Sequence, residues 1–292
     1  MRYAVVDTGS NTIRLGIYDY ENGTLKCIYN KAVFANLASY IENNSLTQEG
    51  IEKAAEALLI HKKTAEKYGC ALSVFATAAI RNARNCHEIR EKIKELADID
   101  IDVLTGEDEA LLSFYGAVSD FPVKDGVMAD VGGGSSEIIL FKNGSPVSFC
   151  SVPLGSLKAY KTFVSGNVTT ETEAKNIKDE VFKYLSGHEE FLSLDVKNLC
   201  IVGGGVKSAS ALCKKLLNTD FEKTMVLNEI LKIIFKDPEK SEDVIVNIAP
   251  ERAKTVSPAI SIYAAVSDFF NCENIFISDL GIKEGYILKK LV

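Results

Sequence analysis

The strongest constraint on the fold is an internal repeat. An apolar strand that ends on an acid, a short glycine turn, a second strand and an Asn-Gly hairpin occur twice in this order. Three pairs of residues align at an offset of 123 residues: Asp7 with Asp130, Gly9 with Gly132, and Arg14 with Glu137. Self-similarity of this kind indicates two structural units of one design, and the length of 292 residues suits two domains.

Each repeat predicts three strands, a helix, a fourth strand and a further helix. In the first repeat we expect strands at 3–7, 12–18, 24–29, 72–76 and 101–104, with helices at 47–68, after 85 and from 107. In the second we expect strands at 126–130, 137–141, 146–151, 198–202 and 274–278, with helices from 206 and at 281–291. The fold class is therefore α/β, with domains at 1–121 and 122–292. The C-terminal helix, about 281–292, either completes the second unit or returns to the first.

Two sequence patterns predict helix caps. Asn85-x-x-Glu88 precedes a run of apolar residues at helical spacing and reads as a capping box. Thr105-x-x-Asp108 is a second candidate cap, at the start of the helix that carries Glu107 and Glu109.

The charge balance excludes several classes of protein. The net charge is −7 and the pI is about 5.2, which argues against general binding to nucleic acid or to a membrane surface. A local phosphate site remains compatible with this charge, because backbone N–H groups bind anions. No apolar run has the length of a membrane span, and the N-terminus lacks a signal peptide, so we expect a cytoplasmic protein.

Cysteine and histidine usage disfavours three further kinds of site. The seven cysteines contain no C-x-x-C pair and are expected to be reduced. The three histidines show no ligand spacing, so a zinc site is not expected. Because G-x-S-x-G is also absent, a serine triad has little support.

The two glycine turns predict phosphate binding. Glycine lets the backbone approach an anion closely, and a carboxylate in front of each turn suits Mg²⁺ that is held mostly through water and phosphate. One such hairpin alone is more often structural. The occurrence of two at matching places, after Asp7 and after Asp130, favours the functional interpretation.

A third glycine run, Gly203-Gly204-Gly205, lies between a predicted strand and a predicted helix. This context fits phosphate or nucleotide at a helix N-terminus. G-x-G-x-x-G does not open the first βα turn, and Gly-Lys-Ser/Thr does not occur, so Rossmann and P-loop sites are not predicted.

The motifs together resemble the exopolyphosphatase and guanosine pentaphosphate phosphohydrolase family, over most of the chain. Four segments carry the resemblance: Asp7 to Leu15, Ala76 to Asn85, Gly106 to Ala110, and Asp130 to Glu137. The resemblance implies two ribonuclease H-like (actin-like ATPase) domains with a central cleft. It also implies removal of the terminal phosphate from linear polyphosphate or guanosine pentaphosphate, and a homodimer, since members are often dimers.

The resemblance also implies roles for individual residues. Glu109 would be the catalytic base, with Glu137 helping to hold metal or water, and Asp7 and Asp130 would anchor Mg²⁺. The phosphate-binding set comprises Gly9, Ser10, Asn11, Arg14, Thr77, Arg81, Gly132, Gly133, Gly134, Ser135, Gly204 and Gly205. These roles suit hydrolysis, which needs a base for water and cations with N–H donors for the phosphoryl oxygens.

Each charged residue also has a structural interpretation when taken singly. Acids such as Glu109 are favoured in a first helical turn by the helix dipole. Arg14 and Glu137 could be exposed strand residues that pair across the cleft, and Arg81 could be a solvated loop charge. Only their joint occurrence favours a site.

The chain departs from the family pattern at three places. The late turn continues as Val206-Lys207 where the family has threonine, and Lys158 and Lys283 stand where arginine is usual. Lysine keeps a point charge but lacks the planar fork that grips two phosphate oxygens. On the family pattern, we expect none of the extra helical C-terminal domain that longer members carry.

Two other functions remain open. A kinase of the same fold would need an adenosine pocket in the second domain and an acid that binds the acceptor. A non-catalytic sensor of a phosphorylated alarmone or of polyphosphate would not need Glu109 as a base. Phosphate release from polyphosphate, with and without magnesium, distinguishes the three.

Overall fold

The computed structural model describes residues 1–192 and 196–292 and divides the chain into two compact units. Unit 1 comprises Met1–Gly116 and Ile282–Val292, and unit 2 comprises Ala117–Gly281. The boundary expected between 121 and 122 falls a few residues after this division.

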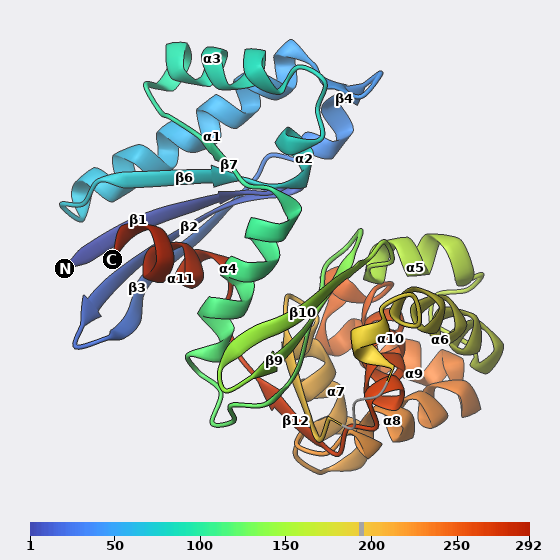
Figure 1. Cartoon of the computed structure of the whole chain (residues 1–292). Coiled ribbons are helices and arrows are strands. Elements are labelled where there is room, and N and C mark those ends of the chain that lie inside the picture. Colours follow the sequence, from blue (N-terminus) through green and yellow to red (C-terminus); the bar gives the residue numbers. More distant parts are fainter. Residues whose placement is uncertain (193–195) are drawn as a thin grey trace. The chain divides into compact units, whose positions relative to one another are not determined.

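Unit 1 is an α/β unit with a five-stranded sheet (Figure 1). Its strands are β1 (Arg2–Thr8), β2 (Thr12–Glu21), β3 (Thr24–Phe34), β6 (Leu72–Ala76) and β7 (Asp102–Val103), with a small hairpin of β4 (Ile41–Glu42) and β5 (Ser45–Leu46). Its helices are α1 (Gln48–Lys67), α2 (Ala78–Arg81), α3 (Cys86–Ala97), α4 (Gly106–Val118), which continues to the start of unit 2, and α11 (Ile282–Tyr286). A 3₁₀ turn covers Leu37–Tyr40 and a π-helical turn covers Ile287–Leu291.

Unit 2 also contains a five-stranded sheet. Its strands are β8 (Gly126–Val131), β9 (Ser136–Lys142), β10 (Ser145–Val152), β11 (Asn198–Val202) and β12 (Asn274–Ile277). Its helices are α5 (Ser156–Phe163), α6 (Glu171–Leu185), α7 (Val206–Leu217), α8 (Met225–Lys236), α9 (Pro238–Ile248) and α10 (Val256–Phe270), with 3₁₀ turns at Glu189–Phe191 and Pro250–Arg252.

The two sheets have the same topology. Strand order is β3-β2-β1-β6-β7 in unit 1 and β10-β9-β8-β11-β12 in unit 2. In each, the first three strands are antiparallel and the last two run parallel to the first strand of the repeat. The predicted duplication and the α/β fold class are confirmed.

The hairpins form as the Asn-Gly pairs predict. Asn22 and Gly23 have φ of 50° and 82°, and Asn143 and Gly144 have φ of 51° and 72°. Positive φ at both central residues is the type I′ turn, whose twist matches that of the flanking strands. Each hairpin therefore fixes the register between the two strands that it joins, β2 with β3 and β9 with β10.

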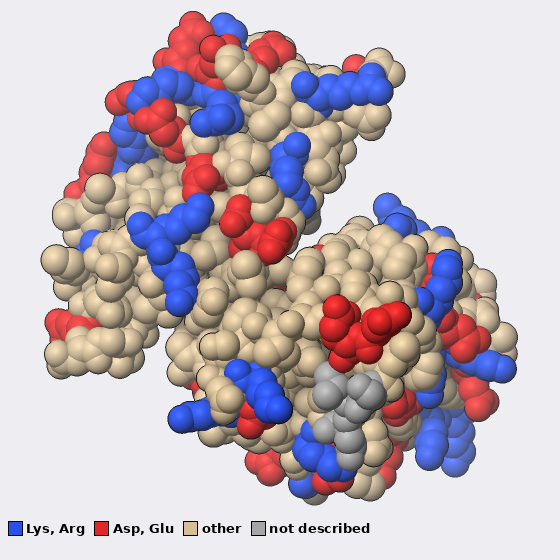
Figure 2. Space-filling model, in the orientation of Figure 1, with Lys and Arg blue, Asp and Glu red and all other residues tan. Residues whose placement is uncertain are grey.

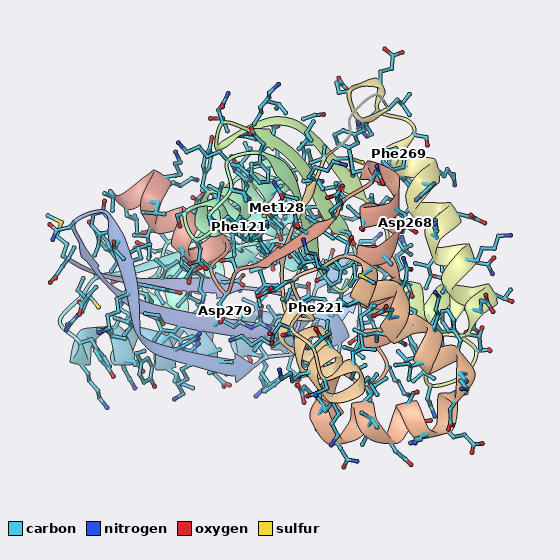
Figure 3. All side chains as sticks on the ribbon, turned by 90° about the horizontal axis from the view of Figure 1, so that it is seen from below. Phe121, Met128, Phe221, Asp268, Phe269 and Asp279 are labelled. Carbon is cyan, nitrogen blue, oxygen red and sulfur yellow. The ribbon has the colours of Figure 1, made fainter. Side chains whose placement is uncertain are left out.

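The core of each unit lies between the sheet and its helices. In unit 1, α1 and α3 cover one sheet face around Val6, Leu15 and Leu58 (Figure 1). In unit 2, helices pack on β8 and β9 around Val127 and Ile138. Asp268 and Phe269, labelled in Figure 3, join α10 to α6 through a 2.6 Å ion pair with Lys178 and an edge-to-face contact with Phe182.

The C-terminal helix α11 packs in unit 1, on the sheet face opposite α1. Tyr18 Oη donates a 2.5 Å hydrogen bond to Glu284, and both side chains are buried. A Cβ on Gly285 would lie 1.7 Å from the carbonyl oxygen of Leu112 in α4. Only glycine allows the backbones of α11 and α4 to approach so closely.

One predicted cap is confirmed and the other is wrong. Thr105 and Asp108 form reciprocal bonds at the start of α4, at 2.8 to 3.3 Å. Asn85 makes no side-chain cap, because its amide bonds both backbone groups of Leu46 at 2.9 and 3.0 Å. The side chain therefore ties the β4-β5 hairpin to α3.

The surface charges, the helices and the cysteines agree with what the composition predicts. On the face shown in Figure 2, basic and acidic side chains are interspersed over both units. Among the described residues, no helix combines the length and apolarity that crossing a membrane requires. All seven cysteines are free thiols.

Candidate functional site

In unit 1, predicted site residues gather at the carboxyl ends of the parallel strands β1 and β6. Asp7 is the penultimate residue of β1, and Thr77 directly follows β6. The Thr77 N–H donates to the Thr8 carbonyl at 3.5 Å, so the two strand ends lie together. The carboxyl ends of parallel strands are where open α/β sheets bind ligands.

The first glycine turn is held in place by backbone bonds. The Gly9 N–H donates to the Thr12 carbonyl at 3.2 Å, which closes the turn. The carbonyl oxygens of Ser10 and Asn11 accept bonds from the segment 35–38, which follows β3, at 2.8 to 3.1 Å. The turn is therefore a rigid loop at the end of β1.

Arg14 is exposed on β2, directly opposite Asp7 in the strand register. Side chains of opposite residues in antiparallel strands project from the same face, with Cβ atoms about 5 Å apart. The Arg14 and Asp7 side chains therefore start from the same sheet face, at the strand end that carries the first turn. The arrangement suits binding of a phosphate oxygen by Arg14.

Arg81 and Glu109 form an ion pair. Arg81 Nη1 lies 2.7 Å from Glu109 Oε2 and also donates to the Leu104 carbonyl at 3.2 Å. The side chains are 25% and 34% exposed, so both reach solvent. The Thr105 cap fixes the first turn of α4, from which Glu109 projects.

In unit 2, two carboxylates occupy the matching strand positions. Asp130 of β8 is directly opposite Glu137 of β9, as Asp7 is opposite Arg14. Glu137 Oε1 accepts hydrogen bonds from Ser135 Oγ at 2.8 Å and from Ser151 Oγ at 3.2 Å. At this position of the repeat, unit 2 therefore has the acidic residue Glu137 where unit 1 has the basic residue Arg14.

The second glycine turn repeats the closure of the first. The Gly132 N–H donates to the Ser135 carbonyl at 3.0 Å, the counterpart of the bond from Gly9 to Thr12. Gly133 and Gly134 are exposed, and their outer sides are open to a ligand.

The third glycine run lies against Asp130 at the end of β11. Gly203 has φ of 101°, and a Cβ there would lie 2.8 Å from Asp130 Oδ1. Glycine is therefore required both by the backbone conformation and by the carboxylate. Gly205 approaches Tyr263, whose hydroxyl donates to the Val202 carbonyl at 3.2 Å. Burial, and then the Asp130 carboxylate, raise the pKa of Tyr263, so it stays a neutral donor.

Arg252 is a candidate site residue that none of the sequence motifs includes. A Cβ on Gly204 would lie 2.3 to 3.1 Å from three atoms of the Arg252 guanidinium, so the cation lies directly against this glycine. Arg252 follows α9 and belongs to no recognisable sequence motif. Its position beside Gly204 is seen only once the helices are packed. It places a positive charge beside the glycine run and near Asp130 and Tyr263.

Each unit carries carboxylates of the kind that Mg²⁺ takes as ligands. Asp130 and Glu137 are two neighbouring carboxylates in unit 2, and Asp7 is one in unit 1. Within residues 1–192 and 196–292, no three His, Cys, Asp or Glu side chains form a complete cage. Mg²⁺ commonly uses one or two carboxylates and completes its octahedron with water and phosphate.

The predicted site residues thus form two groups. Asp7, the 9–11 turn, Arg14, Thr77, Arg81 and Glu109 belong to the strand ends of unit 1, and Asp130, the 132–134 turn, Ser135, Glu137, Gly204 and Gly205 to those of unit 2. That Asp7 and Asp130 face each other across a cleft stays a prediction.

Comparison with known proteins gives one family. The chain matches the sequence model of the Ppx/GppA phosphatase family over residues 16–292. It is 26% identical to the bifunctional 3-dehydroquinate synthase/phosphatase of Fusobacterium nucleatum, over 98% of this chain but 46% of that protein. It therefore spans about half the length of that relative. It is 24% identical to exopolyphosphatase 1 of Mycobacterium leprae, over 100% of this chain and 90% of that one.

A solved structure shows the same fold. The Aquifex aeolicus protein described as a Ppx/GppA family member superposes with a TM-score of 0.87 and 24% identity, covering 100% of this chain and 97% of that one. The actin-like fold class predicted for each unit is thereby confirmed.

Proposed function

Because the chain belongs to the Ppx/GppA phosphatase family, we propose that it hydrolyses the terminal phosphoanhydride bond of linear polyphosphate in a Mg²⁺-dependent reaction. The name of the mycobacterial relative, exopolyphosphatase 1, supports this class of enzyme and substrate. Guanosine pentaphosphate presents the same terminal phosphoanhydride and is the second substrate to test.

The observation that carries the proposal is the Arg81–Glu109 pair at the sheet end that holds the first glycine turn. Glu109 orients a water molecule and accepts its proton as oxygen attacks phosphorus. General-base catalysis of this kind contributes about 10²–10⁴-fold. Arg81 keeps further N–H donors besides Nη1, and these bind oxygens of the phosphoryl group. A base and a phosphate-binding cation thus stand within one hydrogen bond of each other.

The remaining residues bind and orient the chain of phosphates. The 9–11 and 132–134 turns and Thr77 offer donors, with Arg14 and Arg252 as further cations. Gly204 gives room to the Arg252 guanidinium, and Gly205 is buried against Ala259 and Tyr263. Asp7 and Asp130, assisted by Glu137, would hold Mg²⁺, which neutralises charge on the phosphate oxygens. Ser135 and Ser151 orient the Glu137 carboxylate for this task.

The two other functions have less support in the geometry. A kinase needs room for a nucleoside beside the glycine run of unit 2, and the Arg252 guanidinium occupies the space over Gly204. A sensor has no use for a base, whereas Glu109 is held by Arg81 at 2.7 Å. Cytoplasmic location and homodimer formation stay predictions from the sequence.

The direct test is orthophosphate release from long-chain polyphosphate, with guanosine pentaphosphate and ATP in parallel. We expect release from polyphosphate with Mg²⁺ and its loss when the metal is chelated, with recovery on adding Mg²⁺ back. Transfer of phosphate from ATP to an acceptor would favour the kinase. Tight polyphosphate binding with no release under any condition would favour the sensor.

A further inference from the structure

The N-terminus of α5 forms hydrogen bonds to the second glycine turn, residues 132–134. The Gly132 carbonyl accepts from the Ser156 N–H at 2.9 Å and from Ser156 Oγ at 3.1 Å. The Gly133 carbonyl accepts from the N–H groups of Leu157 and Lys158 at 3.0 and 2.9 Å. The first N–H groups of α5, which have no partner inside the helix, are therefore used to hold the turn.

This binding sets the direction of the N–H groups of the turn. A trans peptide is planar, so the carbonyl of one residue and the N–H of the next point in opposite directions. With the Gly132 and Gly133 carbonyls directed to α5, the N–H groups of Gly133 and Gly134 are directed away from it. Both glycines are exposed, so these two donors face solvent.

Gly155 makes this close approach possible. A Cβ at this position would lie 2.6 Å from the Gly132 oxygen, 2.6 Å from the Gly133 carbonyl carbon and 2.7 Å from the Gly134 nitrogen. These are backbone atoms, which cannot move aside like the end of a flexible side chain. The φ of Gly155 is −102°, which any residue adopts, so the requirement is for space alone.

We propose that Gly155 and Ser156 are positioning residues, which aim the Gly133 and Gly134 N–H groups at the oxygens of a bound phosphoryl group. The inference rests on the proposed function and deepens it by assigning a support to one of its two turns. Donors fixed in advance need no reorganisation as charge develops on the oxygens, which is why their rigidity matters for rate. Ser156 is 7% exposed, and its side chain and backbone N–H bind the Gly132 carbonyl, so it acts on phosphate through the turn.

Three variants and a matched control test the proposal. Ser156→Ala removes only the Oγ bond and should lower kcat/KM by about 2–10-fold, the worth of one hydrogen bond. Ser156→Thr keeps the hydroxyl and should recover most of the loss. Gly155→Ala must displace the turn and should lower kcat/KM by about 10²-fold or more, as loss of an aimed N–H donor does. Gly166→Ala adds the same methyl group after α5, where its nearest neighbour is the Val168 carbonyl oxygen at 4.0 Å, and should match the parent.

A binding measurement separates positioning from general damage. Orthophosphate titrated into ¹⁵N-labelled protein should shift the Gly133 and Gly134 amide signals of the parent, Ser156→Thr and Gly166→Ala. The shifts should shrink in Ser156→Ala and vanish in Gly155→Ala, while the remaining spectrum stays that of a folded protein. If Gly155→Ala does not fold, the comparison of Ser156→Ala with Ser156→Thr decides.

The outcomes distinguish this inference from the proposed function. The positioning role is overturned if Ser156→Ala keeps the kcat/KM and the amide shifts of the parent. It is also overturned if a folded Ser156→Thr recovers neither. Both results leave the proposed hydrolase activity intact. Phosphate-dependent shifts that follow the predicted order, in a parent that releases no phosphate, overturn the hydrolase and retain the turn support. A parent whose Gly133 and Gly134 signals ignore phosphate overturns the positioning role directly.

Discussion

Arg81 Nη1 lies 2.7 Å from Glu109 Oε2 and 3.2 Å from the Leu104 carbonyl oxygen. One guanidinium nitrogen thus ties the end of α2 to the first turn of α4. The remaining nitrogens of the planar group are available for a phosphoryl oxygen. Arg81 therefore links the proposed base to the substrate.

Arg81→Lys should impair turnover more than stability. Lysine keeps the charge but lacks the planar fork, so it cannot hold Glu109 and a phosphoryl oxygen at fixed angles. We expect kcat/KM on polyphosphate to fall by about 10–10²-fold, the cost of losing one or two charge-assisted hydrogen bonds. The free energy of unfolding should change by less than about 1 kcal/mol, as for a partly exposed pair. Parental kcat/KM in this variant would remove Arg81 from phosphate binding.

Arg252→Gln should weaken the use of substrate without unfolding the protein. The change removes the positive charge that lies against Gly204 and retains a polar side chain of similar length. We expect kcat/KM to fall by about 10-fold or more, since a hydrogen bond to a charged group contributes about 1.5–3 kcal/mol. Arg90→Gln, an exposed change on α3, is the control. Equal kinetics for the two variants would show that Arg252 does not meet the substrate.

Gly285→Ala should destabilise the protein strongly. The added Cβ would overlap the Leu112 carbonyl oxygen, so α11 must separate from α4. Overpacking commonly costs about 1–3 kcal/mol, and a clash with backbone is at the upper end or beyond. Denaturant unfolding should show this loss. Gly106→Ala, where a Cβ meets nothing within 4 Å, should leave the unfolding midpoint near that of the parent.

Buried tyrosines should make stability decline at alkaline pH. Burial, and then the Asp102 carboxylate, raise the pKa of Tyr286 from 10.0 to about 12, and burial raises the pKa of Tyr18 further. A raised pKa in the folded state gives stability that is fully present below the unfolded value and is lost as pH rises. The free energy of unfolding should therefore fall between pH 10 and 12.

The control for this pH effect is Tyr286→Phe. Its stability should be lower at pH 7, because the 3.1 Å bond from Tyr286 to Asp102 is gone, and should decline less steeply above pH 10. Identical slopes for parent and variant would mean that Tyr286 titrates normally in the folded protein.

Local sequence predicted the strands and turns of the site well. The strand 72–76 and the strand 198–202 have the predicted bounds, because an apolar run and its flanking turns define them within a few residues. The bonds from Gly9 to Thr12 and from Gly132 to Ser135 are equivalent, as the 123-residue offset predicts. Hairpin and turn chemistry of this kind is local and can be recognised in one sequence.

The residues that pack against the glycine turns could not be predicted from local sequence. Arg252 reaches Gly204 only because α9 and α10 pack beside the sheet, and no periodicity records that. Gly155 looks like an ordinary helix boundary until the 132–134 turn is placed against it. The cap predicted at Asn85 does not form because its amide bonds the backbone of Leu46, far away in the sequence. Long-range packing decides such positions, and spacing cannot show it.

Glu109→Gln tests the account most directly. The variant keeps the size of the side chain and a hydrogen-bond acceptor for Arg81, but it removes the basic carboxylate. Phosphate release from polyphosphate should be measured beside polyphosphate binding and thermal unfolding of the same samples. We predict that kcat falls by about 10²–10⁴-fold, with binding equal or slightly tighter and folding retained. A folded variant that releases phosphate within a few-fold of the parent would contradict the assignment of Glu109 as the base.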